Sequence, residues 1–201
     1  MIALALLTTA CAFGLGSLLG FLAATMGGWV DQVLSRFVDV VISIPTLIFA
    51  LIVLSSTGTS ILALVTVIAI IYAMPVYRIA RAVAMDIEVM DYVEAARLRG
   101  EGLWWIMRKE ILPNALTPLA AEFGLRFCFV FLLISGLSFL GLGLQPPLAD
   151  WGAMVRDNGG GIAWGFMHPL VPATCIALLT IGINLIVDSA VQKASGLRED
   201  H

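Results

Sequence analysis

Few side chains in this sequence have the types and spacing that a chemical reaction needs. Glu122 and Arg126 are four residues apart, so on a helix they share one face in the orientation that favours an ion pair. Cys11, Cys128 and Cys175 have no CxxC spacing and no nearby histidine pattern, so we interpret each as apolar packing. No catalytic or metal-ligating set follows, and the sequence favours a protein that is not an enzyme.

Nucleotide hydrolysis is not predicted for this sequence either. A phosphate-binding P-loop needs Gly-Lys followed by Ser or Thr. The two lysines, Lys109 and Lys193, follow Arg108 and Gln192 instead. We therefore expect no cofactor in this chain, and any ATP and Mg²⁺ would belong to a partner.

The composition indicates a membrane protein. Of the 201 residues, 60% are hydrophobic and only 12% are charged, whereas soluble domains have about a quarter of their residues charged. No Asp, Glu, Lys or Arg precedes Asp31, and none lies between Asp39 and Arg78. Because helices satisfy their own backbone polar groups in lipid, an all-α polytopic membrane protein is predicted.

Five transmembrane helices are predicted within a single domain covering 1–201. A bilayer core about 30 Å thick needs about 20 apolar helical residues to cross it. Turn-forming residues from Ser55 to Ser60 divide the second long apolar run into two spans. The spans cover 1–26, 40–56, 60–78, 113–140 and 166–188, and a charged segment, 79–112, joins the third to the fourth. Gly16 and Gly20 form one GxxxG pair, which is compatible with close helix packing.

Basic residues predict the side of the membrane on which each loop lies. Six of the eleven Lys and Arg residues fall between Arg78 and Lys109, so 79–112 is predicted to be cytoplasmic. The other basic residues on that side are Arg36, Lys193 and Arg198. Arg156 is the only basic residue that is predicted to lie in an outer loop. This topology puts the C-terminus in the cytoplasm and Met1 on the outer face, so we expect a further span before this sequence.

The segment 79–112 has the pattern of two helices around a glycine break. Its first part has apolar residues at spacings of three and four, namely Val83, Ile87, Met90 and Val93. This period predicts an amphipathic helix beside the membrane. Gly100 and Gly102 then allow a change of direction. A short helix over 103–111 precedes Pro113, where a new helix is expected to begin.

The same segment contains a short ordered signature. Its residues are Glu94, Ala95, Ala96, Gly100, Ile111, Leu112 and Pro113. Their order and spacing resemble the EAA loop of permeases from binding-protein-dependent ABC importers. The resemblance implies that these residues form a coupling helix that docks in a cleft of a cytoplasmic ATPase. A solvated surface loop is the alternative that composition alone allows.

A second signature follows the fourth span. It reads Ser-Phe-Leu-Gly-Leu-Gly from Ser138, Gln-Pro-Pro from Gln145 and Trp-Gly-Ala-Met from Trp151. The density of Gly and Pro predicts an irregular outer loop, and a plain helix-terminating loop is the alternative to a functional segment. The order is similar to that of the dipeptide, oligopeptide and nickel class of these permeases.

This resemblance implies a permease subunit with a MetI-like transmembrane domain in the bacterial inner membrane. Such a subunit forms half of a pathway for peptides or another small solute, such as nickel or an opine. The implied partners are a second permease subunit, two ATPase subunits, an extracytoplasmic binding protein and the lipid bilayer, with no nucleic acid. The resemblance implies six spans, so we expect the first span and the outer segment after it to precede the five spans predicted here.

The alternatives to an importer are a secondary transporter and an intramembrane hydrolase. A secondary transporter usually carries ionisable relays in several spans, whereas only Glu122 and Arg126 lie deep here. Arg126 is roughly 20 Å along the helix from Pro113, so it should face protein or water. A pathway or subunit contact and a structural ion pair both remain open for these two residues. An intramembrane hydrolase would need a nucleophile with its base, and no convincing set is present.

Overall fold

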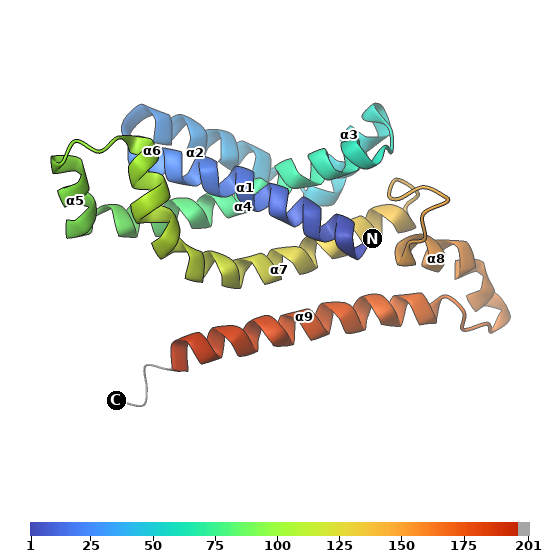
Figure 1. Ribbon diagram of the computed structural model, residues 1–201. Helices are drawn as coiled ribbons and strands as arrows, with labels where there is room; N and C mark the ends of the chain where they lie inside the picture. The colour runs from blue at the N-terminus through green and yellow to red at the C-terminus, as the bar shows by residue number, and fades with distance from the viewer. Residues whose placement is uncertain (197–201) are drawn as a thin grey trace. The chain divides into compact units, whose positions relative to one another are not determined.

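The computed structural model describes residues 1–196, and every regular element in them is helical (Figure 1). In chain order these are α1 (Ile2–Met26), α2 (Gly28–Ser43), α3 (Thr46–Thr57), α4 (Ile61–Glu88), α5 (Asp91–Leu98), α6 (Leu103–Ile106), the π-helix η1 (Met107–Ile111), α7 (Leu112–Phe139), α8 (Trp151–Asn158), the 3-10 helix η2 (Gly159–Trp164) and α9 (Leu170–Gly196). The predicted all-α class is confirmed. Arg198 lies outside the described residues, as does the side chain of Lys193.

Four helical stretches in the described residues are long and apolar enough to cross a membrane. They are Ile2–Met26, Ile61–Glu88, Leu103–Phe139 and Leu170–Ser189. The pair α2 and α3 makes a fifth if the two helices together count as one broken span. The predicted polytopic membrane architecture is therefore present.

The second predicted span, 40–56, is not a straight helix. Instead α2 ends at Ser43, α3 begins at Thr46, and their axes differ by 88°. Pro45 explains the break, because the residue before a proline is pushed out of the helical region. Ile44 is accordingly extended, with φ −85° and ψ 129°.

Other helix limits also differ from those of the predicted spans. Helix α4 continues to Glu88 rather than ending at 78, because charged residues end an apolar run without ending a helix. The fifth span begins at Leu170 rather than 166. Part of the predicted irregular outer loop is helical as α8, which is capped by Asp150: the Ala153 N–H donates to its Oδ2 at 3.2 Å.

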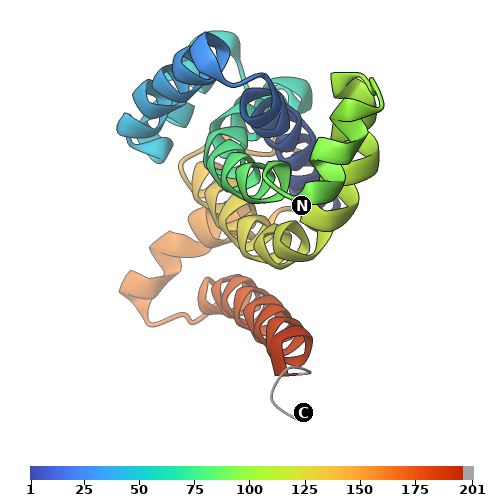
Figure 2. The ribbon, with the colours of Figure 1, turned by 90° about the vertical axis from the view of Figure 1, so that its left-hand side faces the viewer.

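The chain divides into two compact units. Among the described residues, one unit contains 1–9, 47–68 and 123–196, and the other contains 10–46 and 69–122. Helices α1, α4 and α7 each contribute residues to both units. Gly27 separates α1 from α2, and Figure 2 shows the ribbon turning where the second of these two blue helices follows the first.

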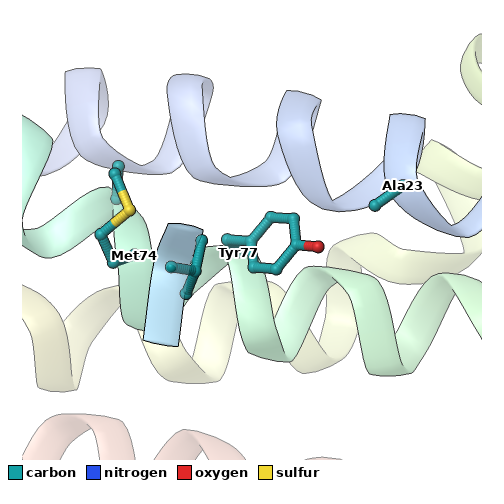
Figure 3. Packing of buried hydrophobic residues seen from close by; sticks show 5 residues of the cluster. Ala23, Met74 and Tyr77 are labelled. Carbon is teal, nitrogen blue, oxygen red and sulfur yellow. The ribbon is translucent and has the colours of Figure 1, made fainter. Parts of the chain in front are cut away.

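An apolar cluster joins α1, α2 and α4 in the second unit. It contains Ala23 of α1, Val38 of α2 and Ala73, Met74 and Tyr77 of α4, all of them buried. Figure 3 shows the side chains of Met74 and Tyr77 between α4 and α1, on the side where Ala23 lies. This packing fixes the face of α4 that α2 covers.

Gly16 and Gly20 bring the backbones of α1 and α4 together. A Cβ on Gly16 would lie 2.5 Å from the carbonyl oxygen of Ala73, and a Cβ on Gly20 would lie 2.8 Å from that of Tyr77. Backbone atoms within a helix cannot move aside to make room. The GxxxG pair is therefore a close-packing contact of the kind seen between membrane helices.

In the first unit, α7 and α9 pack against each other at a similar close contact. A Cβ on Gly124 would lie 2.1 Å from Cγ2 of Val187. Four residues further along α7, the Cys128 thiol lies 3.8 Å from the carbonyl oxygen of Thr180. Cys128 is buried, in agreement with its interpretation as a packing residue, whereas Cys11 is exposed and Cys175 is half-buried.

Replacing Gly20 with leucine should destabilise the protein, because the new side chain collides with the α4 backbone. We expect a loss of about 1–3 kcal/mol, as for other overpacked sites, measured by thermal unfolding of the purified protein in detergent. Gly14→Leu is the matched control, since nothing lies within 4 Å of a Cβ at Gly14. Equal losses in both variants would contradict the packing role of Gly20.

Candidate coupling site

Helix α5 carries the first part of the EAA-like signature. Glu94 and Ala95 are exposed, whereas Ala96 is buried together with Val93, three residues earlier. Because the side chain of Ala96 is small, the backbone of α5 can lie close to the residues that bury this face. The opposite side of α5, which includes Leu98 at 83% exposed, is open.

Gly100 ends α5 in a Schellman motif. Its N–H donates to the carbonyl oxygen of Arg97 at 2.9 Å, and the N–H of Glu101 donates to that of Ala96 at 3.2 Å. Gly100 has φ +83°, a left-handed conformation that costs other residues about 1–2 kcal/mol. The predicted change of direction at this glycine is therefore present, and it depends on the absence of a Cβ.

Two arginines tie α5 to the helices on either side of it. Arg97 forms an ion pair with Glu88, the last residue of α4. Arg99 lies 4.0 Å from a carboxylate oxygen of Glu110 in η1, and its guanidinium is 5.7 Å from the centroid of the Trp105 ring. Both contacts come from the C-terminal end of α5, and they join that end to α4 and to η1.

The second part of the signature lies where η1 meets α7. Ile111 is fully buried, whereas Leu112 and Pro113 are on the exposed side. Helix α7 begins at Leu112, one residue before the predicted start at Pro113, but it continues η1 without a break, so a single helical stretch runs from Leu103 to Phe139. The chain accommodates the proline with a π-turn, in which the Leu112 N–H donates to the carbonyl oxygen of Met107.

The predicted amphipathic helix over residues 83–93 is also divided between two elements. Val83 and Ile87 belong to α4, and Val93 belongs to α5. Met90 between them is extended, with φ −79° and ψ 143°. Asp91 and Glu94 favour a new helix start at this point, because acidic side chains stabilise the first turn of a helix.

Large apolar side chains are exposed around α5. The most exposed are Val89 at 81%, Leu98 at 83% and Trp104 at 68%. We call residues 89–104 the α5 segment. It combines an exposed apolar surface with ion pairs that hold it in place, which suits a docking surface better than a loosely solvated loop.

The predicted deep pair, Glu122 and Arg126, lies in the middle of α7. Both side chains are half-buried. The guanidinium of Arg126 lies 5.9 Å from the centroid of the exposed Phe129 ring. A role of these two residues in the pathway or in a subunit contact stays a prediction.

The second signature folds back on the end of α7. A Cβ on Gly152 would lie 2.2 Å from the carbonyl oxygen of Ser135. The Ser138 hydroxyl accepts a hydrogen bond from the Leu144 N–H at 3.2 Å, and the Trp151 ring meets Phe131 edge-on at 6.1 Å between centroids. Several residues of this signature therefore have packing roles within the first unit.

Sequence reasoning missed the polar contacts between α2 and α4. The contacting pairs are Asp31 with Arg81, Ser35 with Tyr77, and Asp39 with Arg78. Arg81 uses both Nε and Nη2, and the second of these bonds, to Asp31 Oδ2, measures 2.5 Å. The signal that could have revealed this face is the recurrence of polar residues every four positions on α2.

These features define a polytopic helical membrane protein with a charged helical segment outside its apolar spans. Residues 16–194 match the model of the family described as binding-protein-dependent transport system inner membrane component. The chain belongs to that family. The resemblance inferred from the two signatures is therefore confirmed at the level of the family.

Curated relatives include peptide permeases from several bacteria. The chain is 34% identical over 91% of its length to a probable D,D-dipeptide transport system permease protein, DdpC, of Escherichia coli. It is 30% identical over 87% of its length to a glutathione transport system permease protein, GsiD, of Pectobacterium atrosepticum, and 34% over 86% to a di/tripeptide permease, DppC, of Pseudomonas aeruginosa. It spans 61%, 58% and 57% of those three proteins.

Solved structures show the same fold. A chain of the inward-facing MetNI methionine ABC transporter matches with a TM-score of 0.74 at 19% identity, covering 95% of this chain and 91% of that one. A chain of an amino acid ABC transporter matches with a TM-score of 0.60 at 23% identity, covering 92% of this chain and 87% of that one. At these identities the likeness establishes the fold alone.

The ion pair between Arg97 and Glu88 should restrain α5. Arg97→Ala should raise amide hydrogen exchange in Asp91–Leu98 by up to about fivefold, because an exposed ion pair is worth about 0.2–1 kcal/mol. Exchange measured by mass spectrometry tests this. Arg108→Ala is the control, since Arg108 is exposed and takes part in neither of the ion pairs that hold α5.

Exchanging the two charges, with Glu88→Arg and Arg97→Glu in one protein, should restore the slow exchange. If Arg97→Ala and Arg108→Ala exchanged at the same rate in α5, the restraint would have to come from other contacts.

Proposed function

We propose that this chain is the permease subunit of an ABC importer and forms half of its translocation pathway. Its driving force comes from a separate ATPase that docks on the α5 segment. Membership of the inner-membrane transport family supports this proposal. The observation that carries it is the α5 helix, which is joined to α4 and to η1 by ion pairs at its C-terminal end and is exposed on the side of Leu98.

A fastened helix can pass on a displacement, because a push on α5 reaches α4 through Arg97 and η1 through Arg99. Both neighbouring helices continue into apolar stretches long enough to span a membrane. Movement of an ATPase subunit against α5 would therefore move two spans together as packed elements. Glu94, exposed on α5, can accept charge-assisted hydrogen bonds from such a partner.

The proposed orientation places the α5 segment in the cytoplasm. Basic residues accumulate between Arg78 and Lys109. Cytoplasmic loops of membrane proteins carry an excess of Lys and Arg, which supports this orientation. The C-terminus lies on the same side. The proposed assembly contains a second permease subunit, two ATPase subunits that hold ATP and Mg²⁺, and an extracytoplasmic binding protein.

Short peptides are the proposed cargo. Curated relatives carry names that refer to D,D-dipeptides, glutathione and di- or tripeptides. These solutes share a peptide backbone. Nickel and opines are the alternative cargoes implied by the resemblance to the dipeptide, oligopeptide and nickel class of permeases. The test is transport of a radiolabelled dipeptide by cells that express the complete system.

Substitution of Gly100 should uncouple the transporter. Gly100→Leu forces a side chain into a left-handed backbone conformation, which distorts the end of α5. Peptide uptake should fall at least tenfold and the ATPase should no longer co-purify, whereas the amount of protein inserted in the membrane should stay the same. Uptake and co-purification in one preparation test this prediction.

Gly102→Leu is the matched control, because Gly102 lies in the same loop with φ −76° and has nothing within 4 Å of its Cβ position. It should retain uptake and ATPase binding. Normal uptake and ATPase binding in Gly100→Leu would refute docking at the α5 segment.

Glu122→Gln and Arg126→Gln test the pathway role of the deep pair. If these side chains contact cargo or the second permease subunit, each change should lower uptake about tenfold, since a hydrogen bond to a charged group is worth about 1.5–3 kcal/mol. ATPase co-purification should persist. Asp188→Asn, an exposed change on α9, is the control. If the rate and the specificity of peptide uptake were unaltered in both variants, Glu122 and Arg126 would have a structural role only.

A further inference from the structure

Helix α2 lies at the level where α4 leaves the apolar part of the membrane. The stretch of α4 from Ile61 to Tyr77 has no charged side chain and rises about 25 Å, close to the thickness of a bilayer core. The next charged residues, Arg78 and Arg81, are the ones that α2 binds through Asp39 and Asp31. The middle of α2 is therefore held at the membrane boundary.

Helix α2 also begins close to the end of an apolar helix. Its first residue, Gly28, lies two residues after Met26, the last residue of α1. Because α1 is long and apolar enough to cross a membrane, its end and the start of α2 lie near the membrane boundary as well.

The surface of α2 has two apolar faces and one polar face. Leu34, Val38 and Val41 pack against the cluster formed with α1 and α4. A second, exposed row, which we call the α2 stripe, contains Trp29, Val33, Phe37 and Val40. Trp29 is 78% exposed, and tryptophan side chains favour the boundary between lipid and water. This pattern is typical of a helix that lies in the interfacial layer.

A groove of about 540 Å³ lies beside the α2 stripe, and we call it the α2 groove. Its lining includes Trp29, Asp31, Gln32, Arg36, Asp39 and Arg81. It therefore contains two carboxylates and two guanidinium groups. Arg81 is paired with Asp31, whereas exposed Arg36 belongs to none of the ion pairs in the described part of the chain.

We propose that the α2 groove binds the headgroup of an aminophospholipid. Arg36 holds the phosphate, the half-exposed carboxylate of Asp39 accepts from the ammonium, and the acyl chains lie along the α2 stripe. Residues three apart on a helix are neighbours on its surface, which suits a phosphate and an ammonium separated by two carbons. A purely anionic headgroup would meet the two carboxylates, and a free phosphate would leave the stripe uncovered.

The test uses the full-length protein in detergent with phosphatidylethanolamine, phosphatidylcholine and phosphatidylglycerol of identical acyl chains. Native mass spectrometry reads the lipid retained. Phosphatidylethanolamine should be retained over the other two lipids, and Arg36→Gln should lower its retention about tenfold. Asp39→Asn should lower it to the level of phosphatidylcholine. Stronger retention of phosphatidylglycerol, or unchanged retention in Arg36→Gln, would overturn the proposal.

Two controls separate the groove from the rest of the surface. Arg108→Gln removes an exposed basic residue elsewhere and should leave retention unchanged. Arg78→Gln breaks the ion pair with Asp39 but keeps the carboxylate, so phosphatidylethanolamine should still be preferred. If this preference disappeared in Arg78→Gln, the ion pair rather than the headgroup would explain the effect of Asp39→Asn.

A protein in the groove is the remaining outcome. A photoreactive benzophenone side chain introduced at Val33 should cross-link to phospholipid in native membranes. A cross-link to a polypeptide instead would show that a subunit covers the α2 stripe and would refute the lipid site. Neither result depends on whether the chain transports peptides, because no measurement here uses transport or the ATPase.

Discussion

The cost of placing a charge in lipid shapes this protein more than any single contact. Long apolar helices have almost no charged residues within them, and charged residues gather where these helices leave the apolar layer. In the second unit, ion pairs of this kind join different elements rather than residues of one helix. These pairs are Asp31 with Arg81, Asp39 with Arg78, Glu88 with Arg97, and Arg99 with Glu110. Each holds a short helix, α2 or α5, against a neighbouring element.

The positions of the spans could be predicted because apolar length is a local property of the sequence. The break at Pro45 follows from a local rule too, but the continuous apolar run around it concealed the bend of 88°. The extension of α4 to Glu88 could not be predicted from hydropathy, since helical hydrogen bonds continue in water. The limits of α5 depend on Met90 and Gly100, and only the glycine was recognised.

The candidate site was predicted in part. The EAA-like residues and the turn at Gly100 could be read from type and spacing, because a left-handed helix end favours glycine. The partners of Arg97 and Arg99 could not, since each requires knowledge of how α5 sits between α4 and η1. The same holds for Asp31 and Arg81, which are 50 positions apart in the sequence.

The π-turn before α7 has a mechanical consequence. In an unbroken α-helix every N–H holds the carbonyl four residues earlier, and this ladder resists bending. Here the Leu112 N–H reaches back five residues, and Pro113 and Pro118 have no N–H to donate. Three backbone hydrogen bonds of the α-helical pattern are thus shifted or missing within about two turns. Because the stretch 107–118 has fewer hydrogen bonds of the regular α-helical pattern, we expect it to bend more easily than the rest of this helix, so a displacement of η1 would reach α7 as a change of tilt at this point.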